Sequence, residues 1–157
     1  MTSTIDQIAS QERVVVEHMR ESDLDQVLLI EQASYPRPWT RNGFKTELER
    51  SCAINLVLCE MDQVVGYLIF WAIREEIYIL NLALRPDRRR QGLGRNLLEY
   101  MFDWGRKRGM RRAFLEVRVM NQAARKLYEK TGFVMTGRRK NYYAEEKEDA
   151  LLMARNL

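Results

Sequence analysis

The stretch IYILNLALRPDRRRQGLGR (residues 77–95) joins a run of apolar residues to a turn rich in arginine and glycine. Its apolar part, residues 77–84, has the length and the large side chains of a buried strand. A helix is predicted after it, at about residues 94–108, and AFLEVRV (residues 113–119) is predicted as the next strand. Strand, helix and strand in this order predict two parallel strands joined by a right-handed crossover.

Strands and helices also alternate on both sides of this unit. Further strands are predicted at residues 13–19, 54–60, 64–73, 133–140 and 149–156, and helices at residues 22–34, from Thr40 onward, and at 121–132. The helix at residues 22–34 is expected to have Ser22 as its N-cap and to turn Leu24, Val27 and Leu28 toward the core. This order predicts an α/β fold: a mostly antiparallel mixed sheet of about seven strands and about four helices, with a central parallel pair.

Length and composition limit the remaining possibilities. The 157 residues suit one domain, predicted at residues 13–157 after a polar N-terminal extension at residues 1–12. Two cysteines, Cys52 and Cys59, and one histidine, His18, are too few for a disulfide framework or the usual zinc site, so no metal is expected. Neither a signal peptide nor a membrane-spanning run is recognised, which favours the reducing cytoplasm.

The net charge of +4 and the pI of about 9.2 favour anionic partners, without choosing among phosphates, nucleic acid and a ribosome surface. The turn RRRQGLGR (residues 88–95) carries much of this charge. Because it connects a predicted strand to a predicted helix, it places free backbone N–H groups at the positive end of that helix. Gly92 and Gly94 leave the backbone open to a phosphate, and Arg89, Arg90 and Arg95 add positive charge around it.

Two known phosphate motifs do not fit this turn. A P-loop requires lysine and then serine or threonine after its second glycine, where this chain has Arg95 and Asn96. A dinucleotide fingerprint requires a third glycine where this chain has Leu97. The residues alone therefore leave open a phosphate loop of another type, an RNA-binding face and a solvated turn.

The spacing of Arg89, Gly92 and Gly94 resembles the pyrophosphate loop of the Gcn5-related N-acetyltransferases, the GNAT family, which bind acetyl-CoA. The segment FLEVRVMNQAARKLYEKTGF (residues 114–133) is similar to the part that follows this loop in the same family. EQASYPRPW (residues 31–39) and RRKNYY (residues 138–143), together with EDALLMA (residues 148–154), resemble the ribosomal-protein alanine N-acetyltransferases more narrowly. The resemblance extends over nearly the whole chain after residue 12.

Acetyl transfer to an amine needs a base for the amine proton and an acid for the leaving thiolate. The resemblance implies that Glu116 is the base and Tyr128 the acid. The residue pattern alone favours a solvent-facing strand glutamate and a core tyrosine instead. Tyr128 follows Asn121 by seven residues, about two helical turns, so the two are expected on one helix face.

The resemblance also implies a binding site for acetyl-CoA. Main-chain groups of the strand end are expected to pair with the pantetheine arm, which Asn121 also contacts, and the turn is expected to hold the pyrophosphate. The predicted cofactor-binding residues are Leu82, Ala83, Leu84, Arg89, Arg90, Gln91, Gly92, Leu93, Gly94, Arg95 and Asn121.

The acceptor that the resemblance implies is a protein N-terminus, the alanine of small-subunit ribosomal protein eighteen. At pH 7 roughly one α-amine in ten is neutral, against roughly one lysine in a few thousand, which suits a single carboxylate base. Four aromatic residues are predicted to line the peptide site, although each could instead simply pack: Tyr35, Trp39, Tyr142 and Tyr143.

The acidic residues Glu145, Glu146, Glu148 and Asp149 could attract a basic peptide or form a solvated loop. Two other functions stay open. One is an acetyltransferase acting on a small amine or a lysine side chain, and the other is an RNA- or ribosome-binding module that uses the arginine runs.

Overall fold

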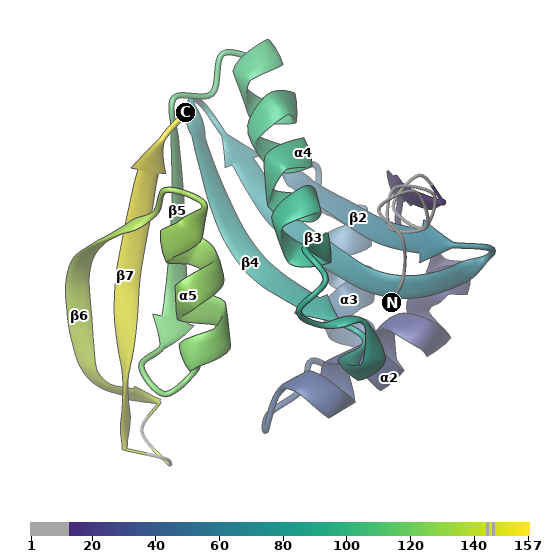
Figure 1. The fold of residues 1–157 in the computed structure, drawn as a ribbon, viewed down its shortest axis with the longest axis horizontal. Coiled ribbons are helices and arrows are strands. Elements are labelled where there is room, and N and C mark those ends of the chain that lie inside the picture. Colours follow the sequence, from purple (N-terminus) through teal and green to yellow (C-terminus); the bar gives the residue numbers. More distant parts are fainter. Residues whose placement is uncertain (1–12, 144, 146) are drawn as a thin grey trace, which may run out of the picture. The chain divides into compact units, whose positions relative to one another are not determined.

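Figure 1 shows the computed structural model, which describes residues 13–143, 145 and 147–157. The predicted N-terminal extension, residues 1–12, lies outside the described residues. The elements are β1 (Val14–His18), η1 (Glu21–Asp23), α2 (Leu24–Ser34), α3 (Arg41–Glu49), β2 (Ala53–Glu60), β3 (Gln63–Ile73), β4 (Glu76–Leu84), η2 (Pro86–Arg88), α4 (Leu93–Lys107), β5 (Arg112–Arg118), α5 (Gln122–Lys130), β6 (Val134–Tyr143) and β7 (Glu148–Asn156). Each strand and helix predicted within this part of the chain is confirmed, and only its ends differ.

The seven strands form one sheet in the order β1-β2-β3-β4-β5-β7-β6. Strands β4 and β5 are parallel, with Glu76 to Tyr78 opposite Arg112 to Phe114. Strand β1 is antiparallel to β2, and β7 is antiparallel to both β5 and β6. The predicted mixed sheet with a central parallel pair is therefore confirmed.

The chain divides into two compact units. The first comprises the described residues up to Ile69 together with Asn81–Leu93, and the second comprises Phe70–Leu80 together with Gly94–Leu157. The change from one unit to the other occurs inside strands β3 and β4 and at the start of α4. For this reason no linker in the sequence marks the boundary.

In the first unit, α2 begins later than the sequence predicts. Its N-cap is Asp23 rather than Ser22, because the 3-10 turn η1 precedes the helix, and the Asp23 carboxylate accepts a hydrogen bond from the backbone N–H of Arg20 (2.8 Å). The buried face consists of Leu24, Val27, Ile30 and Glu31, whereas Leu28 is only half-buried. The helix thus buries Glu31, which the prediction left off the core face, more completely than Leu28, which it placed there.

In the second unit, α4 packs through its leucines and aromatic residues, and Trp104 meets Phe70 of β3 edge-on with ring centroids 5.2 Å apart. Figure 1 shows α5 lying along β5 and β7. Along β5, Ala113, Leu115 and Val117 are buried and Glu116 alternates with them, as predicted. These contacts fix the strand that carries the proposed base.

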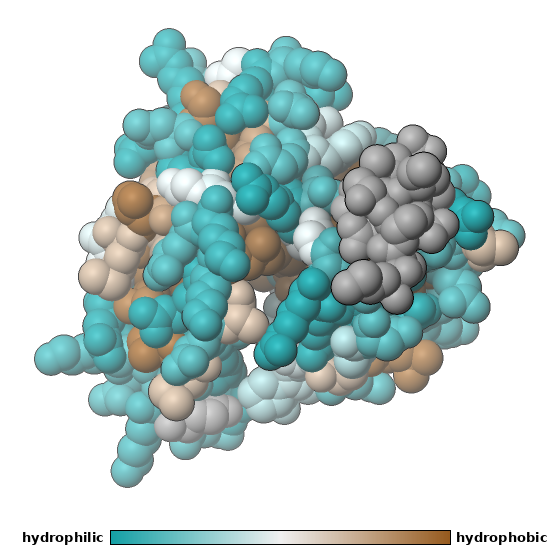
Figure 2. Space-filling model, viewed as in Figure 1, coloured by the Kyte–Doolittle hydropathy of each residue, from teal (hydrophilic) through white to brown (hydrophobic). Residues whose placement is uncertain are grey.

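Charged and polar side chains cover much of the surface. On the face drawn in Figure 2, hydrophobic colour is confined to scattered patches. Among the described helices, none has the length and apolar character needed to cross a membrane.

Candidate active site

The end of β4 leads directly into the arginine- and glycine-rich turn. The Arg85 N–H donates to the Val65 carbonyl (2.8 Å), which keeps β3 beside this strand end. A Cβ on Gly66 would lie 3.0 Å from the Ala83 oxygen and 2.5 Å from a methyl of Leu84, so a larger residue there would require this strand end to shift. Leu82 and Ala83 are buried and Leu84 is half-buried, so their main-chain groups are held in fixed positions.

The turn itself presents unpaired donors. The backbone N–H groups of residues 89–92 donate to no group among the described residues. Arg90 and Gly92 have positive φ angles of 61° and 82°, and a Cβ on Gly92 would meet nothing within 4 Å. Successive free amides in such a turn, directly before a helix, are the arrangement that anion sites use.

The arginines of the turn have different surroundings. Arg89 points back to the fold: its Nε donates to the Leu84 carbonyl (3.2 Å) and its Nη2 to the Ser34 hydroxyl (3.0 Å). Arg88 bonds Glu60 and Gln91. Arg90 is exposed and forms no ion pair with a described residue, and Arg95 is 3.8 Å from Glu99. Arg90 and Arg95 are therefore the side chains with charge to offer a phosphate, while Arg89 shapes the turn.

Leu93 and Gly94, two further predicted cofactor residues of the turn, are buried where α4 begins. The remaining one, Gln91, is exposed, and its Nε2 donates to the Asp87 carbonyl (3.3 Å). The side chain of Gln91 thus helps to hold the turn's conformation, and its contribution to an anion site is its backbone N–H.

Two predicted acceptor residues, Tyr35 and Trp39, also lie in the first unit, and both are half-buried. The Tyr35 hydroxyl donates to the Leu82 carbonyl, and the Trp39 ring packs against Phe44 with centroids 5.1 Å apart. A carbonyl oxygen has two lone pairs, so Leu82 keeps the capacity to accept a second hydrogen bond. Both aromatic residues thus have structural contacts beside the role predicted for them.

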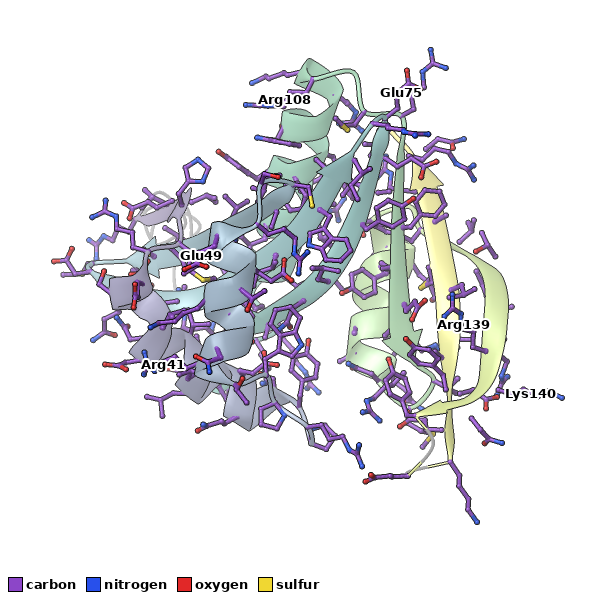
Figure 3. The ribbon with its side chains drawn as sticks, turned by 180° about the vertical axis from the view of Figure 1, so that it is seen from behind. Arg41, Glu49, Glu75, Arg108, Arg139 and Lys140 are labelled. Carbon is purple, nitrogen blue, oxygen red and sulfur yellow. The ribbon has the colours of Figure 1, made fainter. Side chains whose placement is uncertain are left out.

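In the second unit, Glu116 projects from β5 with 32% of its side chain exposed. Its Oε1 lies 3.3 Å from Nη2 of Arg139 in β6. Figure 3 shows Arg139 over the strands of the sheet, while the neighbouring Lys140 projects away from them. No pattern in the sequence predicts this partner of Glu116, which lies 23 residues further along the chain.

Tyr128 of α5 is 6% exposed, and its ring meets Phe133 edge-on at 5.6 Å. Within the described residues its hydroxyl has no hydrogen-bond partner. Burial raises the pKa of Tyr128 well above its ordinary value, so the hydroxyl keeps its proton. The side chain is therefore a core tyrosine, as the pattern favours, and also an uncommitted proton donor.

Asn121 is the N-cap of α5, and its Oδ1 accepts from the Ala124 N–H (3.2 Å). This cap explains why the helix begins here. The Nδ2 group donates to no described residue and is the part of Asn121 that could bond a ligand. Asn121 thus starts the helix that carries Tyr128.

The hairpin of β6 and β7 holds the other two aromatic candidates. The rings of Tyr142 and Tyr143 meet at 5.2 Å, and the Arg118 guanidinium lies 3.8 Å from the centroid of Tyr143. Burial is the main cause that raises the pKa of Tyr143. Arg118 also pairs with Glu148 (3.1 Å).

The acidic run at residues 145–149 has less uncompensated charge to attract a basic peptide than the sequence suggests. Glu148 pairs with Arg118 of β5 and Asp149 with Arg138 of β6, so both charges are compensated by neighbouring strands. Glu146 lies outside the described residues. Among the described residues, no three His, Cys, Asp or Glu side chains group as metal ligands.

Acyl transfer to an amine from the thioester of a coenzyme with a diphosphate requires an anion site, a base and an acid. This chain has a turn of free amides before a helix, a glutamate on the next strand and a protonated tyrosine on the next helix. Residues 24–133 match the family model described as the acetyltransferase (GNAT) family. The chain belongs to that family and is an acetyl-transfer enzyme.

Similar proteins share a more specific name. The chain is 36% identical over 141 residues to the Escherichia coli K12 [ribosomal protein bS18]-alanine N-acetyltransferase, covering 88% of this chain and 95% of that protein. It is 39% identical over 142 residues to a Bacillus subtilis protein provisionally named for the same activity, covering 90% and 94%. The crystal structure of the Escherichia coli ribosomal-protein-S18-alanine N-acetyltransferase superposes with a TM-score of 0.84 at 34% identity, covering 91% of this chain and 93% of that one.

Proposed function

We propose that this enzyme transfers the acetyl group of acetyl-CoA to the N-terminal alanine of ribosomal protein bS18 in the cytoplasm. The observation that carries the proposal is the 36% identity, over 88% of the chain, to an enzyme named for that acceptor. The free amides of the turn and the uncommitted Tyr128 hydroxyl support the same reaction.

Acetyl-CoA supplies the thioester. In the proposed site, main-chain groups of Leu82, Ala83 and Leu84 align the pantetheine arm, and the amides of residues 89–92 hold the pyrophosphate with Arg90 and Arg95. The Nδ2 group of Asn121 bonds the same arm. These residues place the coenzyme and carry no proton of the reaction.

Glu116 and Tyr128 are proposed to move the protons. The neutral α-amine attacks the thioester carbonyl carbon, a C–N bond forms and the C–S bond breaks. Glu116 takes the proton that the amine loses, and Tyr128 gives its proton to the leaving sulfur. The high pKa of Tyr128 keeps that proton in place until the thiolate forms.

Tyr35, Trp39, Tyr142 and Tyr143 are proposed to line the acceptor site. Mass spectrometry of ribosomal proteins from cells that lack this gene separates the proposal from an acetyltransferase with another acceptor. The proposal expects bS18 to lose its N-terminal acetyl group and to regain it when the gene is restored. Unchanged bS18 would favour a small amine or a lysine as acceptor.

An RNA- or ribosome-binding module would show steeply salt-dependent binding to RNA and no thermal stabilisation by acetyl-CoA. The same purified protein serves for both measurements. Stabilisation by acetyl-CoA together with weak RNA binding supports the enzyme.

A further inference from the structure

A buried carboxylate that the proposed reaction does not use lies in the first unit. Glu31 of α2 is only 1% exposed and forms no ion pair with a described residue. Its Oε2 accepts hydrogen bonds from the Tyr67 hydroxyl of β3 and from Nδ2 of Asn81 in β4 (2.8 Å). Its Oε1 accepts from the backbone N–H of Trp39 (3.2 Å).

Such a carboxylate is costly to bury, and hydrogen-bonded donors only offset that cost. Burial, and then the nearby Glu31 charge, raise the pKa of Tyr67, so the Tyr67 hydroxyl stays protonated and remains a donor. Well-packed apolar residues often stabilise a core as well as a buried charged group does. Stability alone therefore gives no reason for Glu31, and its partners indicate what it positions.

These partners join two parts of the proposed site. The segment Tyr35–Trp39 is fixed at one end by the Tyr35 hydroxyl on the Leu82 carbonyl and at the other by the Trp39 N–H on Glu31. The three residues between them, Pro36 to Pro38, are exposed. Asn81, which also bonds Glu31, directly precedes Leu82 in β4. The exposed segment is thus tied at both ends to the last residues of β4.

We propose that Glu31 is a positioning residue that sets the place of the Tyr35–Trp39 segment relative to the end of β4. The acceptor peptide bound by this segment then meets the thioester aligned by that strand. This inference rests on the proposed function, because it requires the coenzyme at β4 and the peptide at the segment. It implies that Glu31 governs transfer to the peptide and leaves coenzyme binding unchanged.

Two variants test the inference. Glu31→Gln replaces one carboxylate oxygen with an N–H donor, which then faces groups that are themselves donors. Tyr67→Phe removes one hydrogen bond from the same carboxylate and serves if Glu31→Gln fails to fold. The matched control is Glu47→Gln, another buried glutamate of this unit (8% exposed), whose carboxylate accepts from Arg50 of the same helical turn.

The measurements are kcat/KM for an alanine-starting bS18 peptide and the Kd for acetyl-CoA. A misplaced segment is expected to lower kcat/KM in Glu31→Gln by roughly tenfold to a hundredfold, because small misalignments of reacting groups cost that much. The Kd for acetyl-CoA should stay at the wild-type value in every variant, and Glu47→Gln should keep wild-type kcat/KM.

The inference is overturned if the folded Glu31→Gln and Tyr67→Phe variants keep wild-type kcat/KM. It is also overturned if Glu47→Gln shows the same loss, since general destabilisation would then explain it. If the wild-type enzyme acetylates no alanine-starting peptide, the proposed function fails first, and that outcome is seen before any variant is made.

Discussion

Replacing Gly92 with glutamate is expected to abolish coenzyme binding while leaving the protein folded. Gly92 has a φ of +82° and open space around a Cβ, so the new side chain costs mainly backbone strain, about 1–2 kcal/mol. In a domain of this size each kcal/mol lowers Tm by about 2–4 °C, so Tm should fall by roughly 2–8 °C. The new carboxylate would stand among the free amides of residues 89–92 and repel a pyrophosphate.

The assay is thermal denaturation with and without coenzyme A. At roughly 100 times its Kd, the coenzyme should stabilise the wild-type protein by about 2.7 kcal/mol, which raises Tm by roughly 5–11 °C. Gly92→Glu should show no such rise.

Gly109→Glu is the matched control. Gly109, in the turn after α4, has a φ of +76° and the same open space around a Cβ, so this variant carries the same strain away from the turn that precedes α4. It should keep the full rise with coenzyme A. A full rise in Gly92→Glu would refute the anion site, and its loss in Gly109→Glu would attribute the effect to strain.

Three further substitutions test individual side chains. Glu116→Gln should lower kcat by about 10²–10⁴-fold with an unchanged thermal shift by coenzyme A, and a wild-type rate would remove Glu116 as the base. Tyr128→Phe should lower kcat in the same way. Because an acid with a raised pKa keeps its proton to higher pH, ionisation of Tyr128 should cause no fall in the wild-type rate up to pH 10, its ordinary pKa. Arg90→Ala should weaken coenzyme binding by roughly twofold to fivefold, and by less at high salt. The control Arg108→Ala, at the other end of α4, should leave coenzyme binding unchanged. Equal losses in both variants would show that only the overall charge matters.

Local patterns explain why so much of the fold could be predicted. The apolar strand 77–84, Pro86 and the glycine-rich turn specify a strand, a break and a helix start within one stretch. The alternation of Leu115, Glu116 and Val117 likewise placed Glu116 on the exposed side of β5. Such features depend on residues close together in the chain, which a single sequence shows.

The contacts that complete the site join distant residues, and the sequence does not show them. Arg89 bonds Ser34, 55 residues away, so its guanidinium has a partner that the sequence does not show. Glu31 bonds Asn81, 50 residues away. One feature of the sequence does point to Glu31: it continues the helical spacing of Leu24 and Val27, at a position where an apolar residue is expected.

The most direct test of the proposed function is acetylation of a synthetic peptide with the N-terminal sequence of bS18, followed by tandem mass spectrometry. A second peptide of the same sequence, with its α-amine blocked and its lysines free, is the control. We expect one acetyl group on the alanine α-amine of the first peptide and none on the second. Acetylation of the blocked peptide, or of neither peptide, would contradict it.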